Sequence, residues 1–282
     1  MSKDKDLRGR YSSKVTATTR QAAQMLLLKP YVWRLLHVHV HGAANLDTLD
    51  APFVAFSNHS SHLDAPLIFG ALPHRLSRYL ATGAAADFFY DKWWKSGPMS
   101  LFFNSFPVDR GKDRAKEKSG KDKEQSKPSR RQQRGMSAAL LADGVPLLIF
   151  PEGTRSRTGA MGPFKPGVAS LCISRDVPAL PIALVGAYAA WPSQQKHLPR
   201  GRPEVHVVIG RPMHPLPGEI AHEFSERMRR QVLELHDTTA RAYGAKTLAE
   251  YAHTIALEKA ARTEITALAE DAKKRANKQE DR

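Results

Sequence analysis

The chain has 282 residues, 41% of them hydrophobic, which is enough for one large α/β domain or two small ones. Its 43 Lys and Arg outnumber its 28 Asp and Glu, for a formal net charge of +15, and its single cysteine, Cys172, excludes an intramolecular disulfide. No apolar run approaches the roughly 18–20 residues of a membrane-spanning helix, and the N-terminus lacks the apolar core of a secretory signal, so we expect neither.

The positive charge is concentrated in two segments. Residues 1–34 carry eight Lys or Arg against two Asp or Glu, and residues 111–134 carry ten against four. Such segments suit an anionic partner, either a nucleic acid or an anionic membrane, and simple solvation is the alternative for each of them. Segments that bind single-stranded nucleic acid also carry aromatic residues that stack on bases, and residues 112–131 have none, which favours the membrane.

The N-terminal region is expected to begin with a disordered basic tail at residues 1–15. Residues 16–36 predict an interfacial helical segment, because their apolar and aromatic residues are flanked by basic ones. Pro30 is expected to break or kink this helix, giving two short pieces. Residues 37–41 alternate His and Val, which predicts a strand with three histidines on an exposed face; without an acidic or cysteine partner they do not indicate a metal site.

Strands and helices alternate along the rest of the chain. Apolar runs predict strands at residues 52–57, 78–82, 106–110, 145–150, 177–185 and 204–209. Helices are expected at residues 65–72, 84–103, 132–142, 166–174, 220–235 and 248–278. Residues 112–131 lack large apolar side chains and predict a low-complexity insertion. The pattern predicts an α/β domain at 37–240 with a mixed sheet flanked by helices, followed by a helical extension at 241–282.

His59 and Asp64 stand where the strand at 52–57 gives way to a helix. Imidazole is suited to accepting a proton near neutral pH, and a neighbouring carboxylate fixes its tautomer and stabilises the imidazolium. His62, between them, is a second candidate base. On spacing alone, a capped helix with a solvated histidine is the commoner explanation.

A second polar turn, Glu152-Gly153-Thr154-Arg155, follows the strand that ends at Phe150. Gly153 permits a tight turn, Thr154 and backbone N–H groups can donate to phosphate oxygens, and Arg155 offers a planar fork for phosphate. Because a carboxylate is unfavourable beside a phosphate, we expect Glu152 to orient Arg155 or a hydroxyl. The tetrapeptide alone is more often an ordinary turn.

Two more cations follow or precede predicted elements. Arg110 ends the strand at 106–110, and Lys165 lies at the start of the helix at 166–174, a position that favours anions. Surface salt bridging is the alternative for both.

Taken in order, these blocks resemble the glycerolipid acyltransferase family of the lysophosphatidic acid acyltransferase type. That family's H-x-x-x-x-D block is matched by His59 and Asp64, and its F-P-E-G-T-R-S block at every position from Phe150 to Ser156. Its arginine-bearing block is matched by Arg110, and its proline-bearing apolar strand around residues 177–181. The arginine block departs from the family where Asn104 and Val108 replace the frequent glycine and isoleucine.

The resemblance implies direct acyl transfer from acyl-CoA or acyl carrier protein to 1-acylglycerol 3-phosphate, giving phosphatidic acid. His59 would deprotonate the acceptor hydroxyl, Asp64 would support the imidazolium, and backbone N–H groups near the start of the following helix would stabilise the oxyanion. The residues implied to hold the acceptor phosphate are Arg110, Glu152, Gly153, Thr154 and Arg155, assisted by Lys165. It implies no metal, no cofactor and no acyl-enzyme.

The resemblance and the charge pattern together predict a peripheral protein on the cytoplasmic face of the cell membrane. Its partners would be the anionic membrane, the lysophospholipid acceptor and the acyl donor, and not a nucleic acid. Candidate walls for the acyl tail are Phe88, Trp93, Trp94 and Phe102, with ordinary core packing as the alternative. Rival functions are acylation of glycerol 3-phosphate, a lysophospholipid or a glycolipid, and a basic protein that only binds nucleic acid or lipid.

Overall fold

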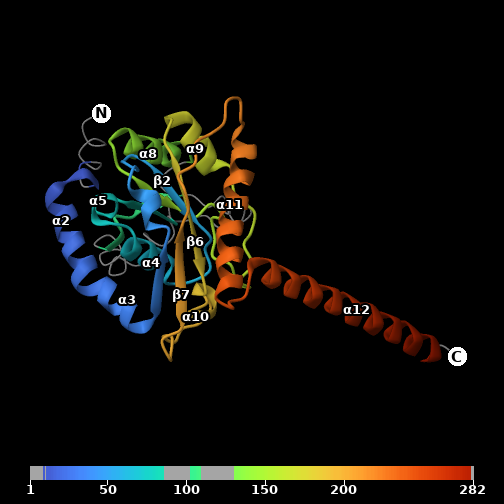
Figure 1. The fold of residues 1–282 in the computed structure, drawn as a ribbon. Coiled ribbons are helices and arrows are strands. Elements are labelled where there is room, and N and C mark those ends of the chain that lie inside the picture. Colours follow the sequence, from blue (N-terminus) through green and yellow to red (C-terminus); the bar gives the residue numbers. More distant parts are fainter. Residues whose placement is uncertain (1–8, 10, 86–101, 109–129, 281–282) are drawn as a thin grey trace, which may run out of the picture.

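A mixed seven-stranded sheet organises the part of the chain that the structure describes (Figure 1). The structure is a computed structural model that describes residue 9 and residues 11–85, 102–108 and 130–280. Across the sheet, the strands follow the order β1 (His37–His41), β7 (Glu204–Ile209), β6 (Ala179–Val185), β2 (Val54–Ser57), β5 (Leu147–Ile149), β3 (Ala81–Ala85) and β4 (Phe106–Val108). Neighbouring strands are parallel except for β6 and β7, so the predicted α/β class with a mixed sheet is confirmed.

The central strands are buried on both faces, which explains their continuous apolar runs. In β2, Val54 and Phe56 enter one hydrophobic cluster while Ala55 enters the other. In β5, Leu147 and Leu148 divide in the same way. This alternation follows from the two-residue period of a strand, and it requires helices on both sides of the sheet.

Helices cover both faces of the sheet (Figure 1). The first cluster is covered by α8 (Arg130–Ala142), α9 (Gly167–Arg175) and α11 (Ala221–Ala242). The second is covered by α3 (Lys29–Leu35), α4 (Asp64–Ala71) and α5 (His74–Ser77). The short helix α10 (Ala187–Ala190), only four residues long, has no counterpart among the predicted elements. The strand expected at 78–82 begins later, at Ala81, because α5 and the turn after it occupy the preceding residues.

The N-terminal helical segment continues through Pro30, so of the break or kink expected there, the break is wrong. It consists of α2 (Lys14–Ala23), the π-helical turn η1 (Gln24–Leu28) and α3, with no interval between them. Pro30 cannot donate an N–H to the turn before it, and its ring crowds a carbonyl there. A wider π-helical turn in that place accommodates proline without ending the helix.

This segment presents an apolar face to solvent. Val32 and Leu36 are buried in the second cluster. The exposed apolar side chains on the other face are Met25, Leu26, Leu27 and Tyr31. Tyr11, within the segment expected to be a tail, is buried in the first cluster.

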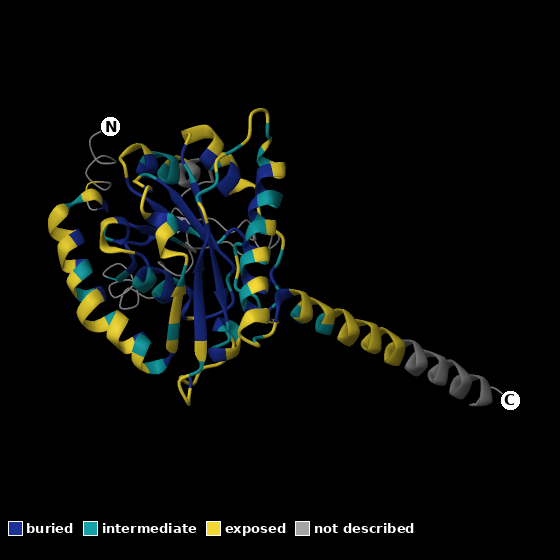
Figure 2. Ribbon diagram, in the orientation of Figure 1, coloured by how far each residue is buried: buried dark blue, intermediate teal, exposed yellow. Residues whose placement is uncertain are grey.

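The C-terminal helix α12 (Leu248–Glu280) projects away from the sheet (Figure 1). Its side chains are mostly exposed where they are described, in contrast to the buried sheet (Figure 2). In the part of the chain that the structure describes, no helix combines the length and apolar character needed to cross a membrane.

Candidate active site

The site lies where three neighbouring parallel strands end. β2 is flanked by β5 and β6 and is parallel to both, so their carboxyl ends meet at one edge of the sheet. The chain that follows each strand supplies the site: residues 58–63 after β2, residues 150–166 after β5 and residues 186–193 after β6. Open α/β sheets characteristically bind ligands at this edge.

His59 and Asp64 form a hydrogen-bonded pair. The His59 Nδ1 lies 2.7 Å from the Asp64 Oδ2. Asp64 is fully buried, whereas 19% of the His59 side chain is exposed. The ring of Phe150 stacks on the imidazole at 3.9 Å between centroids. With Nδ1 facing the carboxylate, the Nε2 is the nitrogen left to exchange a proton with a ligand.

Four backbone N–H groups of this turn donate hydrogen bonds to side chains. Asp64 Oδ2 also accepts the N–H groups of Ser60 at 2.7 Å and Ser61 at 2.9 Å. The His59 N–H donates to Glu152, and the Leu63 N–H donates to the Ser61 hydroxyl. The expectation that N–H groups near this helix start supply an oxyanion hole is therefore wrong for these four, because each already has an acceptor.

The first turn is tied to both neighbouring segments. The Asn58 side chain makes two hydrogen bonds with the backbone of Leu184 in β6, donating at 3.0 Å and accepting at 2.8 Å. The Ser156 N–H donates to the His59 carbonyl at 2.7 Å. These bonds hold the first turn against β6 and against the segment that follows β5.

Glu152 is buried and hydrogen-bonds to the backbone of His59, so it does not face an open phosphate site. It is 8% exposed, and its two carboxylate oxygens accept the N–H groups of His59 and Gly162, each at 2.8 Å. Burial raises the pKa of Glu152 to about 7, against the opposing effect of the two N–H donors. The expectation that Glu152 orients Arg155 or a hydroxyl is corrected: its carboxylate positions the backbone of His59.

Gly153 and Lys165 meet in the second turn. Gly153 has a φ of +72°, in the left-handed region, and a Cβ added there would lie 2.6 Å from the Lys165 Nζ. The Lys165 backbone N–H donates to the Pro151 carbonyl at 3.0 Å, which holds the lysine beside this turn. The backbone conformation thus favours glycine here, and any larger residue would displace the flexible Lys165 ammonium. Thr154, the next residue, is exposed.

Arg155 faces His62, the second histidine of the first turn. The Arg155 Nη1 lies 2.7 Å from the His62 Nδ1. His62 therefore does not share Asp64, whose contact is with His59, and it is not a second base of the same pair. The two turns are joined by three contacts: Glu152 and Ser156 each hydrogen-bond to the backbone of His59, and Arg155 contacts His62.

Comparison with known proteins identifies the family. Residues 37–185, more than half of the chain, match the family described as Acyltransferase. The chain belongs to the acyltransferase family. Both polar turns of this acyltransferase, residues 58–64 and 152–156, lie within the matched region.

Individual relatives carry more specific names. The 1-acyl-sn-glycerol-3-phosphate acyltransferase alpha of Bos taurus is 25% identical over 213 residues, covering 74% of this chain and 66% of that protein. The 1-acyl-sn-glycerol-3-phosphate acyltransferase of Cocos nucifera is 39% identical over 56 residues, 18% of its length. The chain thus spans about two thirds of the bovine relative and less than a fifth of the coconut one.

The fold of this acyltransferase is shared with a solved structure. The crystal structure of the 1-acyl-sn-glycerophosphate acyltransferase PlsC from Thermotoga maritima superimposes with a TM-score of 0.55, at 21% identity, covering 82% of this chain and 81% of that one. At this identity the likeness concerns the fold.

Some predicted site residues of the acyltransferase lie outside the described part. Arg110 and the candidate acyl-tail residues Phe88, Trp93 and Trp94 are among them. Phe102 is described, and it packs against the second hydrophobic cluster. Cys172 is buried, and burial raises the pKa of its thiol to about 12, so it does not supply a thiolate nucleophile.

Sequence reasoning missed the segment after β6. The Trp191 carbonyl accepts the Ser61 hydroxyl at 2.7 Å, and the Ser193 N–H donates to the Ser60 carbonyl at 3.3 Å. The Trp191 ring lies 5.2 Å from that of His62. No sequence signal marks these residues, because they reach the first turn across about 130 positions of the chain.

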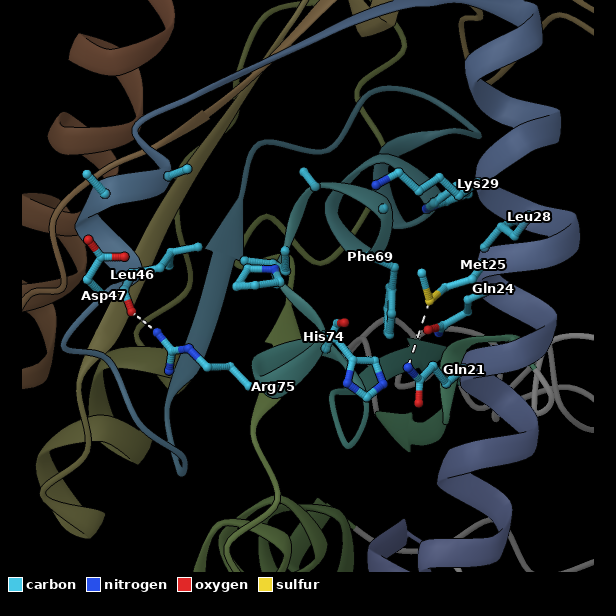
Figure 3. Close-up of a pocket in the computed structure, with 18 residues that line it drawn as sticks. Gln21, Gln24, Met25, Leu28, Lys29, Leu46, Asp47, Phe69, His74 and Arg75 are labelled. Atoms are coloured by element: carbon cyan, nitrogen blue, oxygen red, sulfur yellow. Dashed lines mark hydrogen bonds between the residues drawn. The ribbon is translucent and has the colours of Figure 1, made fainter.

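A separate groove lies beside the N-terminal helix of the acyltransferase (Figure 3). It has a volume of about 590 Å³ and runs between η1 and the end of α4 with α5. Its apolar lining includes Met25, Leu28 and Phe69, with Lys29 and His74 among its polar groups. None of the residues of the two polar turns lines it.

Proposed function

We propose that this acyltransferase moves a fatty acyl group from acyl-CoA or acyl carrier protein to the free hydroxyl of 1-acylglycerol 3-phosphate, giving phosphatidic acid. The observation that carries the proposal is the His59–Asp64 pair, at 2.7 Å, beside the turn that bears Arg155 and over which the Lys165 ammonium lies. A base next to two cations suits a hydroxyl acceptor that bears a phosphate. The names of the bovine and coconut relatives support the same acceptor.

The proposed reaction is a single displacement through a tetrahedral intermediate. The His59 Nε2 removes the proton of the acceptor hydroxyl, and the ionised Asp64 stabilises the resulting imidazolium. The alkoxide oxygen forms a bond to the thioester carbonyl carbon, the carbon–sulfur bond breaks, and the thiolate takes the proton back from His59. No metal or organic cofactor enters these steps.

Lys165 and Arg155 are proposed to hold the acceptor phosphate, with Thr154 as a hydroxyl donor and Arg110 as a further cation. Arg155 offers a planar pair of donors, and the Lys165 ammonium lies over Gly153 as a compact charge. Glu152 contributes by holding the His59 backbone through its 2.8 Å hydrogen bond.

We also propose that the N-terminal helical segment rests on an anionic membrane. Its solvent-exposed face carries Met25, Leu26, Leu27 and Tyr31, with Lys29 and Arg34 exposed beside them. Apolar and aromatic side chains next to basic ones suit the membrane interface, where each Lys or Arg contributes about 1 kcal/mol near an anionic surface. Such a placement would bring the lysophospholipid acceptor to the protein along the membrane.

A purified-enzyme assay tests the acceptor. The full chain is mixed with acyl-CoA or acyl carrier protein and with 1-acylglycerol 3-phosphate, glycerol 3-phosphate, a lysophospholipid or a glycolipid, and products are read by mass spectrometry. We expect phosphatidic acid to be the main product. Preferential acylation of another acceptor would replace the proposal with the corresponding rival function, and binding of lipid or nucleic acid without any acylation would favour a non-catalytic protein.

Vesicle binding tests the membrane contact. Replacing Leu26 and Leu27 by serine should reduce binding to vesicles containing phosphatidylglycerol while leaving the fold unchanged, since both side chains are exposed. The matched control replaces Leu257, an exposed leucine of α12, by serine. Equal binding of all three proteins would contradict the proposed face.

A further inference from the structure

His62 is held in place by contacts from two segments. Its Nδ1 lies 2.7 Å from the Arg155 Nη1, and its ring lies 5.2 Å from the Trp191 ring at 55°. The backbone on either side of it is fixed, because Ser61 forms a bridge with Pro192 and Asp64 begins α4. The backbone that carries His62 is therefore held, and its solvent-exposed imidazole lies against the guanidinium of Arg155.

The donor and acceptor in this contact follow from the chemistry of the two groups. A guanidinium has only donors and stays protonated at any physiological pH. The His62 Nδ1 must then be the acceptor, which requires a neutral imidazole with its proton on Nε2. A protonated His62 would turn an N–H toward Arg155, and the hydrogen bond would be replaced by two facing cations.

The groups around His62 favour the neutral form. Burial lowers the pKa of His62, and the Arg155 guanidinium lowers it further, as does His59. Asp64 and the backbone of Ser193 act in the opposite direction and are outweighed. These groups come from the first turn, the second turn and the segment after β6, which are the parts that contact this side chain.

We propose that His62 is a positioning residue for the acceptor site: its neutral imidazole accepts a hydrogen bond from Arg155 and sets the orientation of the guanidinium toward the acceptor phosphate. This rests on the proposed function of Arg155. It also makes the affinity for the lipid acceptor depend on pH, because acidification protonates the His62 Nδ1, which can then no longer accept the hydrogen bond from Arg155.

Two substitutions separate the hydrogen bond from the shape of the side chain. His62→Phe keeps a ring beside Trp191 and removes the acceptor. His62→Asn supplies a carbonyl oxygen that can accept in place of Nδ1 and does not titrate. We expect His62→Phe to raise the KM for 1-acylglycerol 3-phosphate about fivefold, the size expected for one partly exposed hydrogen bond, with kcat little changed. His62→Asn should retain the wild-type KM at pH 7.5.

The pH dependence gives a second readout. Between pH 7.5 and 5.5 the wild-type KM should rise more steeply than that of His62→Asn, while the protonation of the acceptor phosphate itself is common to both. An unchanged KM in His62→Phe, or equal impairment of His62→Phe and His62→Asn, would overturn the proposal.

A binding-independent measurement distinguishes failure of this inference from failure of the proposed function. The pKa of His62 is measured by NMR in the full chain, with its signal assigned by loss in His62→Asn. Replacing Arg155 by methionine should raise that pKa, since a neighbouring cation is removed. An unchanged pKa would overturn the His62–Arg155 contact whatever the substrate is. A raised pKa in a protein that does not acylate 1-acylglycerol 3-phosphate would refute only the acceptor assignment.

Discussion

The two polar turns of the site follow neighbouring parallel strands, yet they differ in how far their residues are buried. The first turn, residues 58–64, is largely buried, and the N–H groups of His59, Ser60 and Ser61 all donate to carboxylates. The second turn, residues 152–156, buries only Glu152 and presents Thr154 to solvent, with Arg155 partly exposed. One turn is preorganised and the other is accessible.

This difference suits the two tasks proposed for the site. A general base must be held at a fixed distance and in one tautomer before the substrate arrives, since small displacements are costly in rate. A phosphate contact requires side chains that a ligand can reach, and Thr154 and Arg155 are exposed or partly exposed. Glu152 joins the two tasks, because it belongs to the second turn by sequence and to the first by its hydrogen bonds.

Replacing the Asp64 carboxylate of the first turn should have the largest effect on the reaction rate. Asp64→Asn leaves an oxygen to accept backbone N–H groups but removes the charge that fixes the His59 tautomer and stabilises the imidazolium. We expect kcat to fall by about 10²–10⁴ with acceptor KM nearly unchanged. Steady-state kinetics measures this, and a kcat within a few-fold of wild type would show that the pair is not the base.

A smaller effect is expected at Glu152, which belongs to the second turn and accepts a hydrogen bond from the first. Glu152→Gln keeps the shape but replaces one acceptor oxygen by a donor, so either His59 or Gly162 loses its acceptor. Because this shifts the His59 backbone indirectly, we expect kcat to fall by roughly tenfold.

The same substitution should change how stability depends on pH. The folded-state pKa of Glu152 is raised to about 7, so the folded protein holds this proton more tightly than the unfolded chain does. Wild-type stability, relative to Glu152→Gln, is then lost as pH rises from about 4.5 through 7 and levels off above that, a loss of roughly 3 kcal/mol in all. Chemical denaturation across this range checks it, and parallel stability curves for the two proteins would contradict the buried carboxylate.

The smallest effect is expected from a substitution in the second turn, at Gly153. Gly153→Ala places a Cβ at a φ of +72° and 2.6 Å from the Lys165 Nζ, so the flexible ammonium must move. We expect a stability loss of about 1 kcal/mol from the backbone and a several-fold rise in acceptor KM. Gly144→Ala is the control, because Gly144 has a similar φ of +78° and nothing within 4 Å of an added Cβ. Equal kinetics in both variants would argue against a role for Lys165.

The sequence predicted the parts of the molecule that depend on local pattern. The runs that form β2 and β6 are apolar on both faces, and the two polar motifs were placed directly after the strands that became β2 and β5. Local pattern did not reveal which atoms the polar side chains contact. Glu152 bonds to a backbone group 93 positions away, and Trp191 reaches the first turn from a strand end that the motifs do not mark. The helix does not break at Pro30, because the π-helical turn that precedes the proline accommodates it.

The most direct test compares two variants in one assay, with acceptor affinity measured by equilibrium binding and turnover by phosphatidic acid formation. His59→Ala should lose at least about 10³ in kcat while keeping the wild-type affinity for 1-acylglycerol 3-phosphate. Arg155→Ala should keep kcat within a few-fold and lose about tenfold in acceptor affinity. A folded His59→Ala protein with near-normal turnover would contradict the account.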